Sequence, residues 1–156
     1  MNSKINKGMK VSFYTLGCKL NTSETGSIIE KFIEKGYQVV AFEDCADIVY
    51  INTCTVTSKA DSTCRNIIRR ARKYSPNAII AVTGCYAQLS SEKLQSMLEV
   101  DIVLGTEQKE KIFDFLQSKD KFNGVVDISR STDDKFFLKG LSALEDGRTR
   151  AFLKVQ

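Results

Sequence analysis

The sequence predicts an α/β fold, in which helices cover both faces of a mostly parallel sheet of about five strands. From residue 10 onward, short apolar runs of strand length alternate with longer runs whose apolar residues recur at helical spacing. The run at residues 47–52 (DIVYIN) is apolar almost throughout, which is typical of a strand buried on both faces. With 156 residues, of which 42% are hydrophobic, the chain is long enough for one domain with a core.

The first part of the chain contains three predicted strands and a helix. Residues 10–16 form the first strand, and Asn21 with Glu24 three residues later is typical of a helix N-cap and its capping-box partner. Gly36 is predicted to end that helix. The second and third strands are predicted at residues 37–42 and 47–52.

A long helix at residues 58–74 follows the third strand and has two different faces. Its apolar residues are predicted to pack on the core, and they are Ala60, Cys64, Ile67, Ile68 and Ala71. Its basic residues form another stripe, made of Arg65, Arg69, Arg70, Arg72 and Lys73. The remaining predicted elements are a strand at 78–82, a helix at 91–98, a strand at 101–104 and a helix at 107–116.

One compact unit is predicted, preceded by a short tail and followed by a connection. The tail covers residues 1–9, and the unit covers residues 10–117. Residues 118–156 are more polar and contain only short apolar pieces, which predicts a strand and then an extended connection.

The composition excludes several kinds of chemistry. The chain has no histidine, so Ser-His and Cys-His catalysis and histidine-ligated zinc are excluded. Its five cysteines are odd in number and far apart, which favours reduced thiols over a disulfide framework. No apolar run approaches the roughly 20 residues that cross a bilayer, and the first nine residues lack the apolar centre of a signal peptide. We therefore expect a cytoplasmic protein with no membrane partner.

Three cysteines follow predicted strands: Cys18 the first, Cys54 the third and Cys85 the fourth. A flavodoxin-like strand order of 2-1-3-4-5 puts these three strands side by side, and ligands bind at the carboxyl edge of such sheets. Because neighbouring strands lie about 4.8 Å apart, thiols far apart in sequence can surround one small group at this edge.

The three cysteines are typical ligands of an iron–sulfur cluster. Each precedes a predicted helix start, where backbone N–H groups and the helix dipole favour the thiolate. Three thiolates suit such a cluster better than structural zinc, which normally takes four protein ligands. A [4Fe-4S] cluster held by Cys18, Cys54 and Cys85 leaves one iron open to an exogenous ligand. The prediction is therefore a metal and cofactor site at these residues, with no separate catalytic residue.

The other two cysteines are predicted not to be ligands. Cys64 lies on the apolar face of its helix and is expected in the core. Cys45 precedes the third strand, which places it at the opposite edge of the sheet, about 17 Å or more from the site.

Three fragments resemble the N-terminal domain of the radical-SAM methylthiotransferases: TLGCKLN at 15–21, NTCTVTSKAD at 52–61 and TGCYAQ at 83–88. The resemblance covers about residues 10–116 and implies that Cys18, Cys54 and Cys85 hold an auxiliary [4Fe-4S] cluster. It also implies that a methylthio group is installed with S-adenosylmethionine and a second [4Fe-4S] cluster, which a CxxxCxxC motif binds in a following domain. This sequence has no CxxxCxxC, and its residues 148–156 resemble the segment before that motif. We expect a fragment that is inactive alone, and a sulfur source at the open iron of the full-length enzyme.

Lys19 and Leu20 resemble the branch of the family that modifies N6-threonylcarbamoyladenosine at position 37 of tRNA, which makes tRNA the expected partner. The isopentenyladenosine-tRNA branch typically has a GCQMN-like loop, and the branch that modifies a ribosomal protein has GCPKN. Those two branches stay open as alternatives. A third alternative is a free-standing iron–sulfur module for electron transfer or ligand binding.

Two sets of polar side chains have both a functional and a structural interpretation. The basic stripe can contact tRNA phosphates, in keeping with the net charge of +4, or form a solvated helix face. Asn21 and Asn52 can donate hydrogen bonds near the cluster sulfurs, or they can serve in caps and turns. The sequence does not indicate an oligomeric state.

Overall fold

The computed structural model describes residues 8–17, 19–54, 58–117 and 125–127. Its strands are β1 (Lys10–Thr15), β2 (Gln38–Val40), β3 (Ile48–Thr53), β4 (Ile79–Gly84), β5 (Ile102–Leu104) and β6 (Val125–Asp127). Its helices are α1 (Lys19–Glu34), α2 (Ser58–Tyr74), α3 (Cys85–Leu89), α4 (Ser91–Gln95), the 3-10 helix η1 (Lys109–Lys111) and α5 (Ile112–Gln117). No helix in these ranges is long and apolar enough to cross a membrane.

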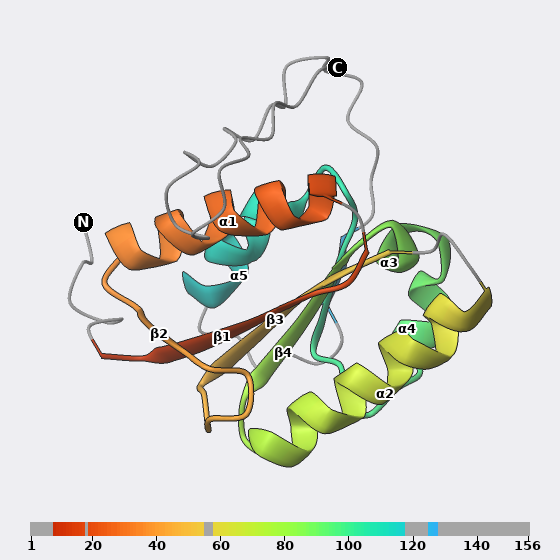
Figure 1. Ribbon diagram of the computed structural model, residues 1–156, viewed down its shortest axis with the longest axis horizontal. Coiled ribbons are helices and arrows are strands. Elements are labelled where there is room, and N and C mark those ends of the chain that lie inside the picture. The colour runs from red at the N-terminus through yellow and green to blue at the C-terminus, as the bar shows by residue number, and fades with distance from the viewer. Residues whose placement is uncertain (1–7, 18, 55–57, 118–124, 128–156) are drawn as a thin grey trace.

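The strands form one parallel sheet in the order β2-β1-β3-β4-β5-β6. Helices α1 and α5 cover one face and α2 and α4 the other, so the fold has three layers (Figure 1). The predicted α/β class is confirmed, and the first five strands have the expected order. Strand β6 pairs with β5 and lies in the segment where a strand was predicted to precede the connection.

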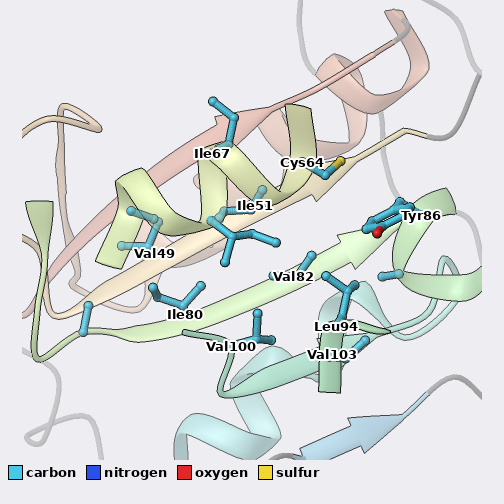
Figure 2. Packing of buried hydrophobic residues seen from close by; sticks show 14 of the residues in the cluster. Val49, Ile51, Cys64, Ile67, Ile80, Val82, Tyr86, Leu94, Val100 and Val103 are labelled. Carbon is cyan, nitrogen blue, oxygen red and sulfur yellow. The ribbon is translucent and has the colours of Figure 1, made fainter. Parts of the chain in front are cut away.

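The central strand β3 is buried along its whole length, because its side chains alternate between two cores. Val49 and Ile51 pack with Ile68 of α2 and with β4 in one core (Figure 2). Ile48 and Tyr50 face α1 and α5 in the other core. Aromatic rings dominate that second core, and those in contact are Phe13, Phe32, Tyr37, Tyr50 and Phe113.

One helix start was predicted wrongly and one short helix was missed, and both differences fall at the carboxyl edge of the sheet. Helix α1 begins at Lys19, so Asn21 lies inside its first turn and is not the N-cap. The helix predicted at residues 91–98 begins where expected, as α4, but ends at Gln95. A short helix that was not predicted, α3, begins directly after β4 at Cys85. After β4 there is no connecting loop, because the residue that follows the strand is already the first residue of α3.

Candidate functional site

The carboxyl ends of β1, β3 and β4 lie level with one another. Thr15 pairs with Asn52, and Asn52 pairs with Thr83. One residue further on, Thr53 pairs with Gly84. Any residues that directly follow these strands therefore begin from the same edge of the sheet, as the predicted strand order requires.

Two of the three predicted ligand residues lie at this edge. Cys54 follows β3 directly and is only 6% exposed. Cys85 follows β4 directly, is the first residue of α3 and is exposed. Cys18 lies outside the described residues, but the neighbouring Gly17 is described. The structure thus brings the ends of two cysteine-bearing strands together and shows where the third cysteine's neighbour lies.

Gly17 packs directly on the Cys54 side chain. Its φ of +104° is a backbone conformation that side chains rarely adopt. A Cβ atom at Gly17 would collide with the Cβ of Cys54 and lie 2.8 Å from its Sγ. Only a glycine can approach Cys54 this closely. Gly17, the residue before Cys18, therefore packs against the side chain that carries the Cys54 thiol.

Gly84 makes the equivalent approach from the other side. Its φ is +100°, and a Cβ there would collide with the carbonyl oxygen of Thr53 and lie 2.7 Å from Asn52 Oδ1. The residue before Cys85 therefore packs on the residue before Cys54. Sequence reasoning missed both glycines, although the signal was present: each forms a Gly-Cys pair shortly after a strand.

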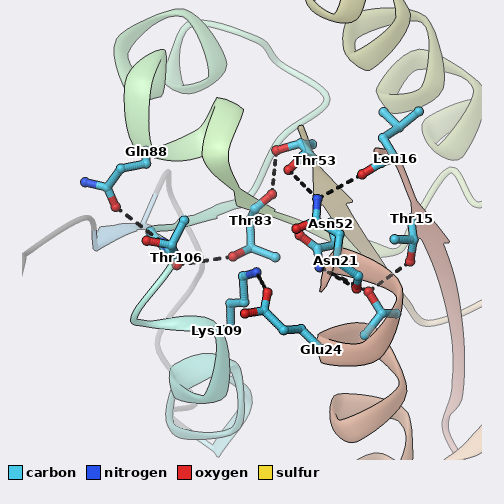
Figure 3. A network of polar contacts seen from close by, with 12 residues as sticks. Thr15, Leu16, Asn21, Glu24, Asn52, Thr53, Thr83, Gln88, Thr106 and Lys109 are labelled. Carbon is cyan, nitrogen blue, oxygen red and sulfur yellow. Dashed lines mark hydrogen bonds and ion pairs between the residues drawn. The ribbon is translucent and has the colours of Figure 1, made fainter. Parts of the chain in front are cut away.

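Asparagine side chains join the two strand ends to α1 (Figure 3). The amide of Asn21 donates to the carbonyl oxygens of Leu16 at 2.9 Å and Thr53 at 3.0 Å. The amide of Asn52 donates to the Asn21 carbonyl at 3.2 Å and to Thr25 Oγ1 at 3.1 Å. Three of the four acceptors are backbone carbonyls and the fourth is a threonine hydroxyl, so these bonds hold the backbone around the site in place.

Tyr86, directly after Cys85, fastens α3 to the beginning of α2. Its buried hydroxyl donates a hydrogen bond to Asp61. Burial, together with this bond, raises the pKa of Tyr86 to about 12. The same bond is the main reason why the pKa of Asp61 is lowered. Both residues belong to the sequence fragments on which the family resemblance rests.

The two cysteines predicted not to be ligands lie where expected. Cys64 is fully buried in the core under α2 (Figure 2). Burial raises the pKa of its thiol to about 11, so it keeps its proton near neutral pH and is a poor metal ligand. Cys45 is exposed and precedes β3, at the opposite edge of the sheet.

The basic stripe of α2 does not form one uniform surface. Arg72 is a structural residue, because its guanidinium donates to the carbonyls of Pro76, Ala78 and Glu99 and to Asp101 Oδ2. Arg70 lies over the rings of Phe42 and Tyr74. Arg65 and Arg69 are more exposed than Arg72, and they lie 3.8 and 4.0 Å from carboxylates. Arg72 is therefore occupied inside the protein, and at most part of the stripe is available to a partner.

Beneath the site, a buried ion pair connects α1 with η1 (Figure 3). Lys109 donates to Glu24, and their side chains are only 2% and 9% exposed. Because a buried charge is costly unless it is paired, this contact fixes α1 against η1, which leads directly into α5.

The residues at the edge suit a thiolate-bound cluster. The thiols of Cys54 and Cys85 are of the soft type that iron–sulfur clusters take as ligands. Gly17 lets the segment before Cys18 approach Cys54 closely, and Gly84 lets the segment before Cys85 approach Thr53 closely. Within the described ranges, no three Cys, Asp or Glu residues gather as a metal site, and the third predicted ligand, Cys18, is not among them. The described part of this edge thus contains two of the expected ligands, together with Gly17, the chain neighbour of the third.

Comparisons with known proteins point in the same direction. Residues 10–105 match the uncharacterized protein family UPF0004. The chain is 41% identical over 152 residues to the threonylcarbamoyladenosine tRNA methylthiotransferase MtaB of Aquifex aeolicus, covering 95% of the chain and 36% of the relative. It is 42% identical over 150 residues to MtaB of Bacillus subtilis, covering 94% of the chain and 33% of the relative.

A relative named for another substrate is less similar. The tRNA-2-methylthio-N(6)-dimethylallyladenosine synthase of Methylacidiphilum infernorum is 32% identical over 124 residues, covering 74% of the chain and 27% of the relative. The chain thus spans about a third of the length of the curated relatives it matches.

Proposed function

Because this chain belongs to the UPF0004 family, the N-terminal domain of MtaB-type and related tRNA methylthiotransferases, we propose that it binds the auxiliary [4Fe-4S] cluster of such an enzyme. The ligands are Cys18, Cys54 and Cys85. The contact between Gly17 and the Cys54 thiol carries this proposal, because it brings the backbone next to Cys18 close to the thiol that directly follows β3.

The chain's own residues hold the thiolates at one edge of the sheet. Cys54 is buried and Cys85 is exposed, so the site has a protein side and an open side. A three-thiolate cluster supplies one iron without a protein ligand, at which a sulfur species can bind. The open side is where the rest of the enzyme and the substrate must approach.

The proposed substrate is N6-threonylcarbamoyladenosine at position 37 of tRNA, which receives a methylthio group at C2. Lys19 and Leu20 support this branch, and so do two relatives named for that substrate at 41% and 42% identity, against 32% for the dimethylallyladenosine synthase. The second [4Fe-4S] cluster and S-adenosylmethionine belong to the remainder of the full-length enzyme. We therefore propose that this chain alone, a cytoplasmic domain, does not cleave S-adenosylmethionine.

The experiment for the substrate uses the full-length protein in cells that lack its gene. Nucleosides from digested tRNA are analysed by mass spectrometry. We expect 2-methylthio-N6-threonylcarbamoyladenosine to disappear on deletion and to return with the wild-type gene but not with Cys54→Ala. An unchanged tRNA profile, with a methylthio group missing from a ribosomal protein, would assign the chain to another branch, and no change in either would favour an electron-transfer module.

A further inference from the structure

We infer that Asn21 is a positioning residue for the proposed cluster: its carboxamide holds the segment before Cys18 against the strand end before Cys54. This inference rests on the proposed function, since it concerns the same set of thiols. It assigns to Asn21 a role beyond helix capping, which the observed start of α1 at Lys19 rules out.

The bonds of Asn21 bridge the segments that follow β1 and β3, at the point where both leave the sheet. The last backbone bond between them runs from the Leu16 N–H to the Asn52 carbonyl at 2.8 Å. Beyond it, the Asn21 amide donates one bond to the Leu16 carbonyl and one to the Thr53 carbonyl. Leu16 lies two residues before Cys18, and Thr53 directly precedes Cys54. One amide group therefore sets the separation of the two cysteine-bearing segments.

Asn21 is itself held firmly in place. It is 3% exposed, and its backbone carbonyl accepts a bond from the fully buried Asn52. Asn52 also donates to Thr25 Oγ1, which accepts a further bond from Thr15 Oγ1 at 2.9 Å. The first turns of α1 are thus tied to both β1 and β3, so the carboxamide has little freedom to move.

The bridge lies next to the place where Gly17 packs on Cys54. Asn21 Nδ2 is 3.4 Å from the position that a Cβ of Gly17 would take, and Cys54 Sγ is 2.8 Å from the same point. Removing the bridge frees Gly17 to move away from Cys54. Residues that orient metal ligands in this way typically contribute about 10- to 100-fold to metal affinity.

Ser75 provides a matched control at the opposite edge of the sheet. It is also fully buried and also bridges two segments, because its Oγ accepts from the Ala46 N–H at 2.9 Å and donates to the Asp44 carbonyl at 3.4 Å. Its loss should weaken the fold without affecting the separation of the site thiols.

The test compares wild type, Asn21→Asp, Asn21→Ala and Ser75→Ala. Aspartate keeps the size of asparagine but cannot donate, and alanine removes both donors without adding charge. Each protein is reconstituted anaerobically with iron and sulfide, and an iron chelator is titrated in while the visible absorption and the electron paramagnetic resonance spectrum are recorded. The chelator concentration that removes half of the iron should fall about 10-fold or more in both Asn21 variants, with an altered resonance spectrum. Ser75→Ala should keep both wild-type values.

Three results would overturn the inference while leaving the proposed function intact. They are wild-type chelator resistance in both Asn21 variants, an equal loss in Ser75→Ala, and unfolding of both cluster-free Asn21 variants at 25 °C, which would make Asn21 a residue that the fold itself requires. Failure of wild type to take up iron would overturn the proposed function, and the inference with it.

Discussion

Gly17 lies against the thiol of Cys54 so closely that any larger residue would have to displace that side chain. This contact is between segments that leave different strands, and both strands end at the same level of the sheet. Gly84, the residue before Cys85, approaches the carbonyl oxygen of Thr53 equally closely.

Gly17→Ala should therefore damage the site more than an ordinary glycine substitution. Gly36→Ala is the matched control, because Gly36 also has a positive φ, +87°, but has nothing within 4 Å of its Cβ position. Backbone strain alone should lower the free energy of unfolding by about 1–3 kcal/mol in both variants. Only Gly17→Ala should lose further stability from the collision and bind less iron after reconstitution. Equal iron contents in the two variants would contradict this account.

The hydrogen bond between Tyr86 and Asp61 should make the stability of the fold depend on pH in the acidic range. The pKa of Asp61 is lowered in the folded protein, so the ionised carboxylate contributes to the free energy of unfolding. This contribution is complete above the ordinary aspartate pKa of about 3.9 and is lost as the pH falls through the lowered pKa. Tyr86→Phe removes the main cause of the shift. The urea midpoint of this variant should thus fall less than that of wild type as the pH is lowered. Tyr37→Phe, another buried tyrosine, should follow wild type, and parallel curves for all three proteins would refute the assignment.

The ion pair between Glu24 and Lys109 should be essential for stability. Lys109→Met leaves the buried Glu24 without this partner and should cost about 3–5 kcal/mol of unfolding free energy. The control is Lys111→Met, which breaks a more exposed pair with Asp127 and should cost about 1 kcal/mol or less. Urea denaturation measures both, and similar losses would show that the pair beneath the site does not differ from a surface contact.

Arg72 should behave as part of the fold, unlike its neighbours on the same stripe. Its guanidinium bonds to Asp101 and to three carbonyls, so Arg72→Ala should cost about 2–3 kcal/mol, and lysine should restore little because it lacks the fork of donors. Arg69→Ala removes an exposed side chain and should change stability by about 0.5 kcal/mol or less. A thermal melt distinguishes them, and an unaffected Arg72→Ala would contradict the structural role.

Much of the fold could be predicted from the sequence, because strands buried on both faces and amphipathic helices have distinct patterns. The apolar run at residues 47–52 predicted β3 almost to the residue, and the helix predicted at 58–74 coincides with α2. Cys64 was placed in the core from helical spacing alone. In each case the information lies in neighbouring residues, which periodicity can reveal.

The site's supporting contacts could not be predicted, because they join residues far apart in sequence. Glu24 and Lys109 are 85 residues apart, and nothing local to either indicates the other. Asn21 was misinterpreted because its spacing to Glu24 imitates a capping box, whereas both side chains bond to distant segments. Gly17 was missed because its close contact is with Cys54, which follows another strand and is far from it in sequence.

The most direct test of the cluster-domain proposal is the iron and sulfide content of the anaerobically reconstituted chain and its five cysteine variants. Wild type should contain about four iron and four sulfide per monomer, with broad visible absorption. Replacing Cys18, Cys54 or Cys85 by serine should abolish or sharply destabilise the cluster. The Cys45→Ser and Cys64→Ser proteins should retain it, although burial of a hydroxyl should cost Cys64→Ser some stability. A full cluster in Cys85→Ser, or none in wild type, would contradict the assignment of this sheet edge as an iron–sulfur site.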